Sequence, residues 1–284
     1  LNPAVRDASS NLYNDVSIRG FNLNGHNMYL NGIQGMLDQQ HAADIYIDKA
    51  TVIAGPNLGI VGTPNRENLG GTILFTSKKA QAEPNLDLTL DYQGGESFKE
   101  VVDLGARLGH NQRWGIRVMA DNIQGETAID GDKLTQRDFF VNIDQKTKKS
   151  KTNLLVGYNY ADQKGAQFTW NFNEYNQPKG SRLPKAPDNG RSYLPEWTNN
   201  EYDNWIATLN HEQILSDHTT AFFNAGYHHE DWYGYQYGTP RLQNENGDYT
   251  VHPENYPLAV TTKYFGGGIK GKFNLGLTKH NYVL

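Results

Sequence analysis

Apolar and polar side chains alternate without exception from Leu86 to Gln93. Because successive side chains of a β-strand point to opposite faces, this period of two predicts a strand with one apolar and one polar face. The pattern recurs over 102–109, 114–121, 138–144 and 153–160, and more weakly over 202–213, 219–230, 264–275 and from 279 onward. Phe140 is an exception, since it occupies a polar position of its strand. The chain is therefore predicted to be mainly β.

The polar face of these strands carries Asp, Arg, Asn and many Gly, while the apolar face carries Leu, Val and aromatic residues that gather near strand ends. Tight turns (107–114 and 145–152) alternate with long connections (124–134, 163–200 and 238–261). Strands of about 9–11 residues with short turns at one end and long loops at the other are typical of outer-membrane β-barrels. A soluble antiparallel β-sandwich also has alternating strands, so it remains open as the alternative.

The composition excludes several classes of protein. The 284 residues include no Cys, which rules out a disulfide scaffold and Cys-based metal or redox chemistry. No apolar run reaches the roughly 18 residues that indicate a transmembrane helix. The formal net charge of −5 argues against a general nucleic-acid binder, so no nucleic-acid partner is expected.

The first 83 residues have a different texture from the rest. Short apolar pieces separated by Asn-Gly, Gly-Pro and Thr-Pro predict short strands and turns, and 41–49 has the weak periodicity of a short helix. The pair Glu83-Pro84 separates this part from the alternating strands. We therefore divide the chain into a small mixed α+β domain over 1–83 and a strand-rich domain over 84–284.

Four motifs occur in order in the first domain: Ser17–Phe21 (SIRGF), Tyr29–Ile33 (YLNGI), Ile47–Pro56 (IDKATVIAGP) and 70–79 (GGTILFTSKK). Together they resemble the plug domain of TonB-dependent outer-membrane receptors, the siderophore class in particular. The resemblance implies a plug over 1–83 inside an antiparallel transmembrane barrel of about 22 strands, of which 84–284 supplies the first. The residues with a structural role in these motifs are Ser17, Arg19, Gly20, Phe21, Gly32, Asp48, Gly55, Pro56, Gly70 and Gly71.

The sequence departs from that pattern at three positions. Asn31 replaces a usual Asp and Thr51 a usual Glu, and Ala54 takes the place of the Lys or Arg before Gly55-Pro56. In relatives this cation is thought to lock the plug against barrel carboxylates, so the resemblance does not extend to that lock.

Only eight or nine strand-like runs follow Pro84, fewer than a barrel needs to enclose a plug. We therefore expect the natural protein to continue beyond both ends of this chain. The segment that relatives use to engage the energy-coupling complex is expected to be absent from it.

The resemblance implies a receptor in the bacterial outer membrane that binds an extracellular ferric siderophore and imports it by TonB-coupled active transport. Its implied partners are the siderophore, outer-membrane lipid and the TonB-ExbB-ExbD complex. Iron belongs to the transported chelate, so no resident cofactor and no catalytic residue is expected. The alternative function is that of a soluble extracellular β-sandwich module that binds, for example, glycans.

Candidate ligand-binding residues lie in two places. Those on the plug are Arg19, Gln34, Met36, Gln39 and Gln40, and those in the 163–200 loop are Trp170, Tyr175, Arg182, Arg191, Tyr193 and Trp197. Arginine binds anionic groups in a fork geometry and aromatic rings offer stacking surfaces, which suits an anionic chelate with an aromatic shell. The alternatives are a structural ion pair for Arg19 and an aromatic girdle with a solvated loop for the others.

Two further patterns are interpreted as structural. Residues 266–271 fit G-x-G-x-x-G, but they lie in an alternating strand without the βαβ unit of a dinucleotide site. His228 and His229 are adjacent and point to opposite faces, and with Glu230 and Asp231 they indicate a solvated strand end rather than a metal site. No catalytic motif is found, and the chain is not predicted to be an enzyme.

Overall fold

The computed structural model describes residues 5–7, 15–38, 43–55, 69–165, 182, 184–186, 188–237, 241–255 and 257–284. Nearly all regular structure in these ranges is β-strand, accompanied by the short 3₁₀ turns η1 (Gly25–Asn27) and η2 (His110–Gln112). None of the helices in the described ranges has the length and apolar character required to cross a membrane.

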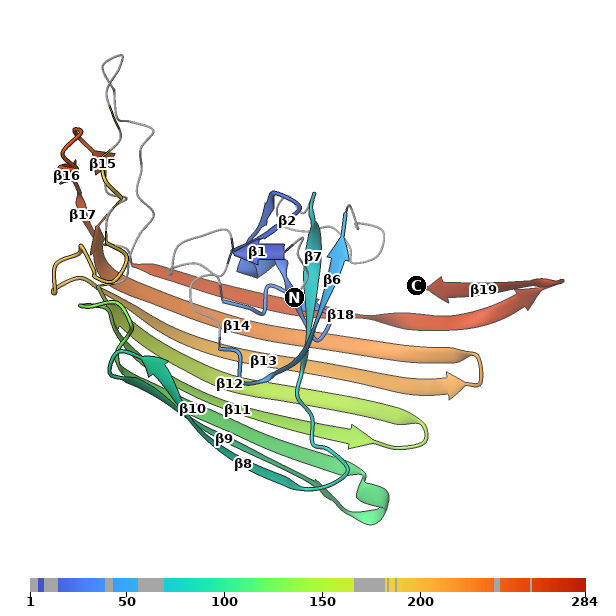
Figure 1. Cartoon of the computed structure of the whole chain (residues 1–284). Coiled ribbons are helices and arrows are strands. Elements are labelled where there is room, and N and C mark those ends of the chain that lie inside the picture. Colours follow the sequence, from blue (N-terminus) through green and yellow to red (C-terminus); the bar gives the residue numbers. More distant parts are fainter. Residues whose placement is uncertain are drawn as a thin grey trace.

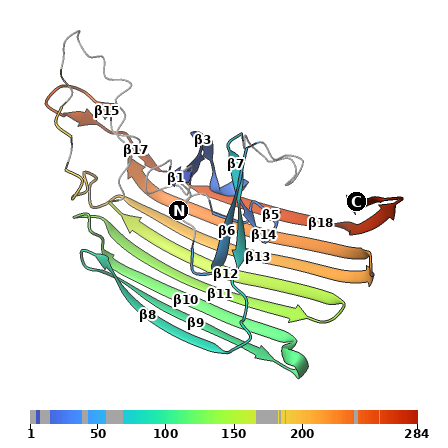
Figure 2. The ribbon, with the colours of Figure 1, turned by 45° about the vertical axis from the view of Figure 1, so that its right-hand side comes forward.

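One large antiparallel sheet, which we call the wall, contains ten strands and is curved into a trough (Figures 1 and 2). Its strands are β8 (Asn85–Gly94), β9 (Ser97–Leu108), β10 (Trp114–Glu126), β11 (Lys133–Lys146), β12 (Ser150–Lys164), β13 (Asn199–Ser216), β14 (Thr219–Tyr237), β17 (Pro253–Asn255), β18 (Leu258–Leu275) and β19 (Thr278–Val283). They pair in the order β19-β18-β14-β13-β12-β11-β10-β9-β8, with β17 added to β14. The wall is therefore a meander that is open within this chain, with β8 and β19 at its two edges.

Two small sheets at the N-terminal end, which we together call the plug, lie on the concave side of the wall (Figures 1 and 2). Their strands are β1 (Val5–Asp7), β2 (Val16–Ile18), β3 (Phe21–Leu23), β4 (Tyr29–Leu30), β5 (Ile33–Gln34), β6 (Ile47–Ala54) and β7 (Gly71–Ser77). One sheet has the order β1-β2-β3 and the other β5-β4-β7-β6. The chain then passes from β7 into β8, the first strand of the wall.

The two faces of the wall differ as the alternation predicts. On the convex face Leu88 is 71% exposed and Phe139 51% exposed. On the concave face the polar side chains of Asn142 and Thr208 are fully buried. Across the described ranges no second sheet covers the convex face (Figure 1), so the two-layer sandwich alternative is wrong.

Phe140, the exception to the alternation, is an apolar residue on the concave face. It suits that position because the plug covers it. Its ring stacks on Tyr46 of the plug with centroids 4.2 Å apart. Three more apolar residues of the concave face, Met119, Leu155 and Ile206, belong to the same buried cluster as Phe140 and the plug core. A hydrophobic patch inside an otherwise polar trough therefore marks the place where the plug packs.

The connections at the two ends of the wall differ in length, as expected. Short turns join β9 to β10, β11 to β12, β13 to β14 and β18 to β19 at one end of the wall, while the longer connections from β12 to β13 and from β14 to β18 leave the wall at the opposite end, where a short turn also joins β8 to β9 (Figure 1). The loop expected over 238–261 is in part wrong, because it contains β15 (Arg241–Leu242), β16 (Tyr249–Thr250) and β17, and β18 already begins at Leu258. In outer-membrane barrels the short turns face the periplasm and the long loops face outward.

The short helix suggested over 41–49 is not formed in the described part of that segment. Residues 45 and 46 form a turn, and strand β6 begins at Ile47 and pairs antiparallel with β7. The β-branched residues Thr51, Val52 and Ile53 in this strand favour the extended conformation over a helix.

The lipid-facing role of the convex face can be tested at two adjacent residues of β8. Leu88→Arg is expected to lower the free energy of unfolding in lipid vesicles by about 2–4 kcal/mol, because a guanidinium then faces the hydrocarbon. Thr89→Arg, on the concave face of the same strand, is the matched control and is expected to have a much smaller effect. Equal denaturant midpoints for the two variants would contradict the assignment.

Candidate functional site

The strongest polar link between plug and wall centres on Asn31, at the turn between β4 and β5. Asn31 Nδ2 donates to Ser77 Oγ at 3.0 Å and to Thr208 Oγ1 of the wall at 3.0 Å, and Asn31 Oδ1 accepts from the Ser77 amide at 3.0 Å. The Asn31 carbonyl accepts from Asn210 Nδ2 at 2.9 Å. Asn142 Nδ2, also on the wall, donates to the same Ser77 hydroxyl at 3.0 Å. The Asn31 side chain therefore connects strand β7 of the plug with strand β13 of the wall, and the Ser77 hydroxyl adds a second wall strand, β11.

The backbone at Asn31 explains the residue types of its motif. Asn31 and Gly32 have φ values of 52° and 81°, which a two-residue type I′ hairpin requires at both central positions. Arg19 and Gly20, with φ values of 54° and 84°, form the equivalent turn between β2 and β3. Asn tolerates the left-handed region far better than most residues, which makes it a suitable turn residue as well as a link.

Ion pairs surround the place where the plug passes into the wall. Arg117 Nε donates to Asp103 Oδ1 at 2.7 Å, and Lys78 Nζ lies 3.1 Å from the other oxygen of the same carboxylate. Arg117 Nη1 also donates to the Lys79 carbonyl at 3.0 Å. Burial lowers the pKa of the Lys79 ammonium. The segment that leads from β7 to β8 is thus held by charge-assisted hydrogen bonds from the wall, which are stronger than hydrogen bonds between neutral groups.

The glycines of the third and fourth motifs permit a close approach of strands. A side chain at Gly70 would lie 2.4 Å from the Ile18 carbonyl, and one at Gly71 would lie 2.2 Å from the Ile53 carbonyl. The Gly55 amide donates to the Gly70 carbonyl at 2.8 Å, which joins the two motifs. Three further motif residues have exposed or half-buried side chains, namely Ser17, Phe21 and Asp48.

The candidate ligand residues of the plug are spread over different environments. Arg19 is exposed at its turn, and no ion pair to it occurs within the described ranges. Gln34 is half-buried and donates to Asn27 Oδ1 at 3.4 Å. Met36 is fully buried and faces Gly226 of the wall, so it packs between plug and wall. Gln39, Gln40 and the motif residue Pro56 lie outside the described residues.

The candidate residues of the long loop partly come together at the long-loop end of the wall, in a cluster that we call the rim (127–132, 184–198 and 241–250). The Arg191 guanidinium lies over the Tyr193 ring at 4.6 Å from its centroid, and the Asp130 amide donates to the Gly190 carbonyl at 2.8 Å. Tyr249 Oη donates to the Tyr193 carbonyl at 3.2 Å. A hollow of about 610 Å³ is lined by residues that include Arg191, Tyr193 and Tyr249.

Arg182 and Trp197 are exposed, Trp197 to 53%, and neither lines this hollow. Trp170 and Tyr175 lie outside the described residues. Sequence reasoning therefore found two rim residues that meet, Arg191 and Tyr193. It missed Tyr249, which comes from a connection more than fifty residues further along the chain.

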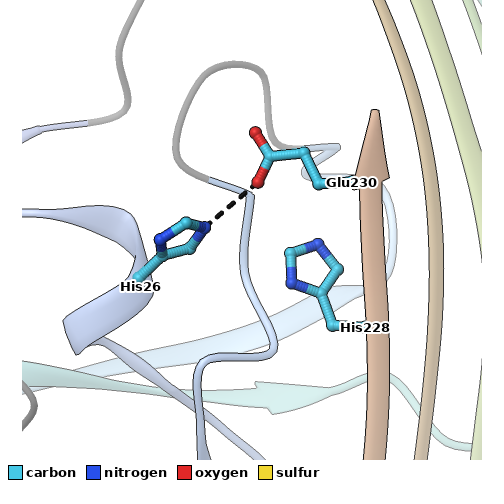
Figure 3. Close-up of side chains that lie close together, drawn as sticks. All are labelled: His26, His228 and Glu230. Carbon is cyan, nitrogen blue, oxygen red and sulfur yellow. Dashed lines mark hydrogen bonds and ion pairs between the residues drawn. The ribbon is translucent and has the colours of Figure 1, made fainter. Parts of the chain in front are cut away.

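A second cluster was not foreseen from the sequence. His26 of η1 and His228 and Glu230 of β14 come together between plug and wall, with one potential ligand atom of each within 4.8 Å of the others (Figure 3). His228 and Glu230 are fully buried, so the interpretation of this segment as a solvated strand end is wrong. The available signal was their spacing of two, which places both on the concave face, but nothing in the sequence linked them to His26.

Known proteins share this architecture. No family profile matches the sequence. A ferrichrome receptor, FcuA of Yersinia enterocolitica, is 27% identical over 270 residues, which cover 94% of this chain and 35% of that receptor. BauA, the ferric preacinetobactin receptor of Acinetobacter baumannii, superimposes with a TM-score of 0.90 at 22% identity, over 99% of this chain and 41% of that one. The resemblance to TonB-dependent siderophore receptors is confirmed.

The likeness extends to more distant structures of the class. The ferripyoverdine receptor of the outer membrane of Pseudomonas aeruginosa gives a TM-score of 0.80 at 14% identity, over 99% of this chain and 38% of that one. This chain spans about a third of the length of the curated relative that it matches, 35%. The plug and an incomplete barrel wall, as expected from the motifs, are the part that it shares with these receptors.

The Asn31 link leads to a prediction for the plug. Asn31→Ala removes the acceptor of the Ser77 amide, so we expect hydrogen exchange of the β7 peptide to accelerate roughly tenfold, as for a lost hydrogen bond of about 1.4 kcal/mol. Asn31→Asp keeps that acceptor, and the Ser77 and Thr208 hydroxyls can donate to its carboxylate, so it is expected to exchange like the parent. Unchanged exchange in Asn31→Ala would show that the link does not hold β7.

Proposed function

We propose that this chain is part of a bacterial outer-membrane receptor that binds an extracellular ferric siderophore and admits it by TonB-coupled movement of the plug. One observation carries the proposal: a plug of two small sheets occupies the polar concave face of a wall whose convex face is apolar and exposed. An apolar exterior suits lipid, and a polar interior filled by a removable domain suits gated passage. The receptors that match the chain support the same function.

The plug is held mainly by polar contacts, which favours movement. Asn31 and Asn142 contribute hydrogen bonds and Lys78 an ion pair, whereas apolar packing is confined to the patch around Phe140. Water can replace hydrogen bonds at little net cost, because the net contribution of each is about 0.5–1.5 kcal/mol. The TonB-ExbB-ExbD complex is the proposed source of the work that separates the remaining contacts.

The rim is the proposed place of first capture. It lies at the long-loop end, which faces outward in barrels of this kind, and it combines a cationic side chain with aromatic rings. Arg191 over Tyr193 offers a charge and a flat surface to an anionic chelate, and Trp197 adds an exposed aromatic face. We propose that Arg182, Trp170, Tyr175 and Arg19 also contact the siderophore.

Growth under iron limitation tests the function directly. Cells with and without the full gene are supplied with purified ferric siderophores of hydroxamate, catecholate and carboxylate type. We expect the gene to be required for growth on at least one of them and for uptake of its radiolabelled iron. Identical uptake of every chelate in the two strains would contradict the proposal.

Capture at the rim can be tested with matched arginines. Arg191→Ala and Trp197→Ala are expected to weaken binding of the transported siderophore by roughly tenfold each, since each removes a contact of about 1.4 kcal/mol. Arg113→Ala is the control, because Arg113 lies over Trp114 at 5.9 Å in a similar pair at the short-turn end of the wall. Affinities measured by fluorescence titration that are equal in all three variants would place capture elsewhere.

A further inference from the structure

The plug and the wall meet at a pair of histidines and a glutamate (Figure 3). His26 Nε2 lies 3.1 Å from Glu230 Oε2, and the rings of His26 and His228 meet edge to face with centroids 6.1 Å apart. Glu230 and His228 come from the wall and are fully buried, while the side chain of His26, from the plug, is 24% exposed. We propose that these three side chains bind a single divalent metal ion of the zinc type, which ties the plug to the wall.

The donor set fits such an ion. Two imidazole nitrogens and one carboxylate oxygen are ligands that Zn²⁺ takes in sites with three protein ligands and a fourth, open position. Tetrahedral coordination places ligand atoms about 3.4 Å apart, so the His26 and Glu230 atoms are already close to ligand spacing. The three ligand atoms lie within 4.8 Å of one another, so the third has to move closer for all three to bind one ion.

The surroundings of His228 orient it as metal-binding histidines are oriented. Its Nδ1 donates to the Gly35 carbonyl of the plug at 3.1 Å, which orients the ring, and Nε2 is the nitrogen proposed to coordinate the ion. A hydrogen bond from the other ring nitrogen to a backbone carbonyl is the usual second-shell partner of a ligating histidine. The ligand, His228, thus belongs to the wall, while the carbonyl that orients it belongs to the plug.

One further acidic group lies against the proposed coordinating nitrogen. His228 Nε2 is 2.5 Å from Asp38 Oδ1 of the plug. Two ligand atoms bound to one tetrahedral Zn²⁺ lie further apart than this, so binding of the ion requires the Asp38 carboxylate to turn away from the ring.

The partial exposure of the His26 side chain gives an ion a path to the site. Because the site lies between the plug and the wall, a bound ion also holds the two together. An ion held by His26 and by two residues of β14 cross-links the plug to the wall in addition to the Asn31 link. This proposal goes beyond siderophore import, since metal binding can be measured without any chelate or energy source.

The test uses the full gene product in detergent, stripped with a chelator and titrated with Zn²⁺ by calorimetry. His26→Asn and Glu230→Gln are expected to bind one ion fewer than the parent, or to bind it at least tenfold more weakly. The neighbours on β14 provide matched controls: His229→Asn and Asp231→Asn alter the same residue types, but His229 and Asp231 face away from the cluster and pair with each other at 3.1 Å. Both controls are expected to bind Zn²⁺ like the parent.

A second measurement does not depend on the variants. Co²⁺ added to the stripped parent is expected to give the strong visible absorption of a four-coordinate site, which excess Zn²⁺ abolishes. The proposal is overturned if the parent binds no Zn²⁺ at micromolar concentrations or gives no such Co²⁺ spectrum. It is also overturned if His26→Asn and Glu230→Gln bind Zn²⁺ like His229→Asn and Asp231→Asn.

Discussion

The buried polar groups on the concave face of the wall determine how the rest of the chain is arranged. Asn142 and Thr208 are fully buried, and a buried polar group without a hydrogen bond destabilises the fold by about 1–3 kcal/mol. Their partners, Ser77 and Asn31, are supplied by the plug. The wall and the plug therefore satisfy each other, and the position of the plug follows from the hydrogen-bonding groups that the strands turn inward.

The same strands present a second surface with opposite requirements. Their convex side chains are apolar and exposed, as at Leu88 and Phe139, and aqueous solvent would leave that area as an unfavourable hydrophobic surface. Lipid removes this penalty, while the closed hydrogen bonding of neighbouring strands leaves few backbone groups to satisfy in the wall interior. One alternation in the sequence thus accounts for both an apolar exterior that suits lipid and a polar, plug-filled interior.

Much of this arrangement could be predicted because its signals are local. The strands follow from the period of two, and the turns at Arg19-Gly20 and Asn31-Gly32 carry residues suited to a positive φ. The contacts between distant segments could not be predicted in the same way. In the sequence Phe140 is only an irregularity of the alternation, and the structure explains it by its stacking on Tyr46. His26 and Glu230 are 204 residues apart in the chain, so no local pattern connects them. The rim shows the same limit, since Tyr249 joins Tyr193 through tertiary packing alone.

Adjacent phenylalanines on β11 allow the most direct measurement of the two-faced wall. A photo-crosslinking benzoylphenylalanine is placed at Phe139 or at Phe140 in the full gene product, and cells are irradiated before mass spectrometry of the crosslinks. From Phe139, which faces outward, the wall predicts adducts with lipid; from Phe140, which stacks on Tyr46, it predicts adducts with the plug segment 43–48. Protein adducts from Phe139, or lipid adducts from Phe140, would contradict a lipid-facing exterior with the plug inside.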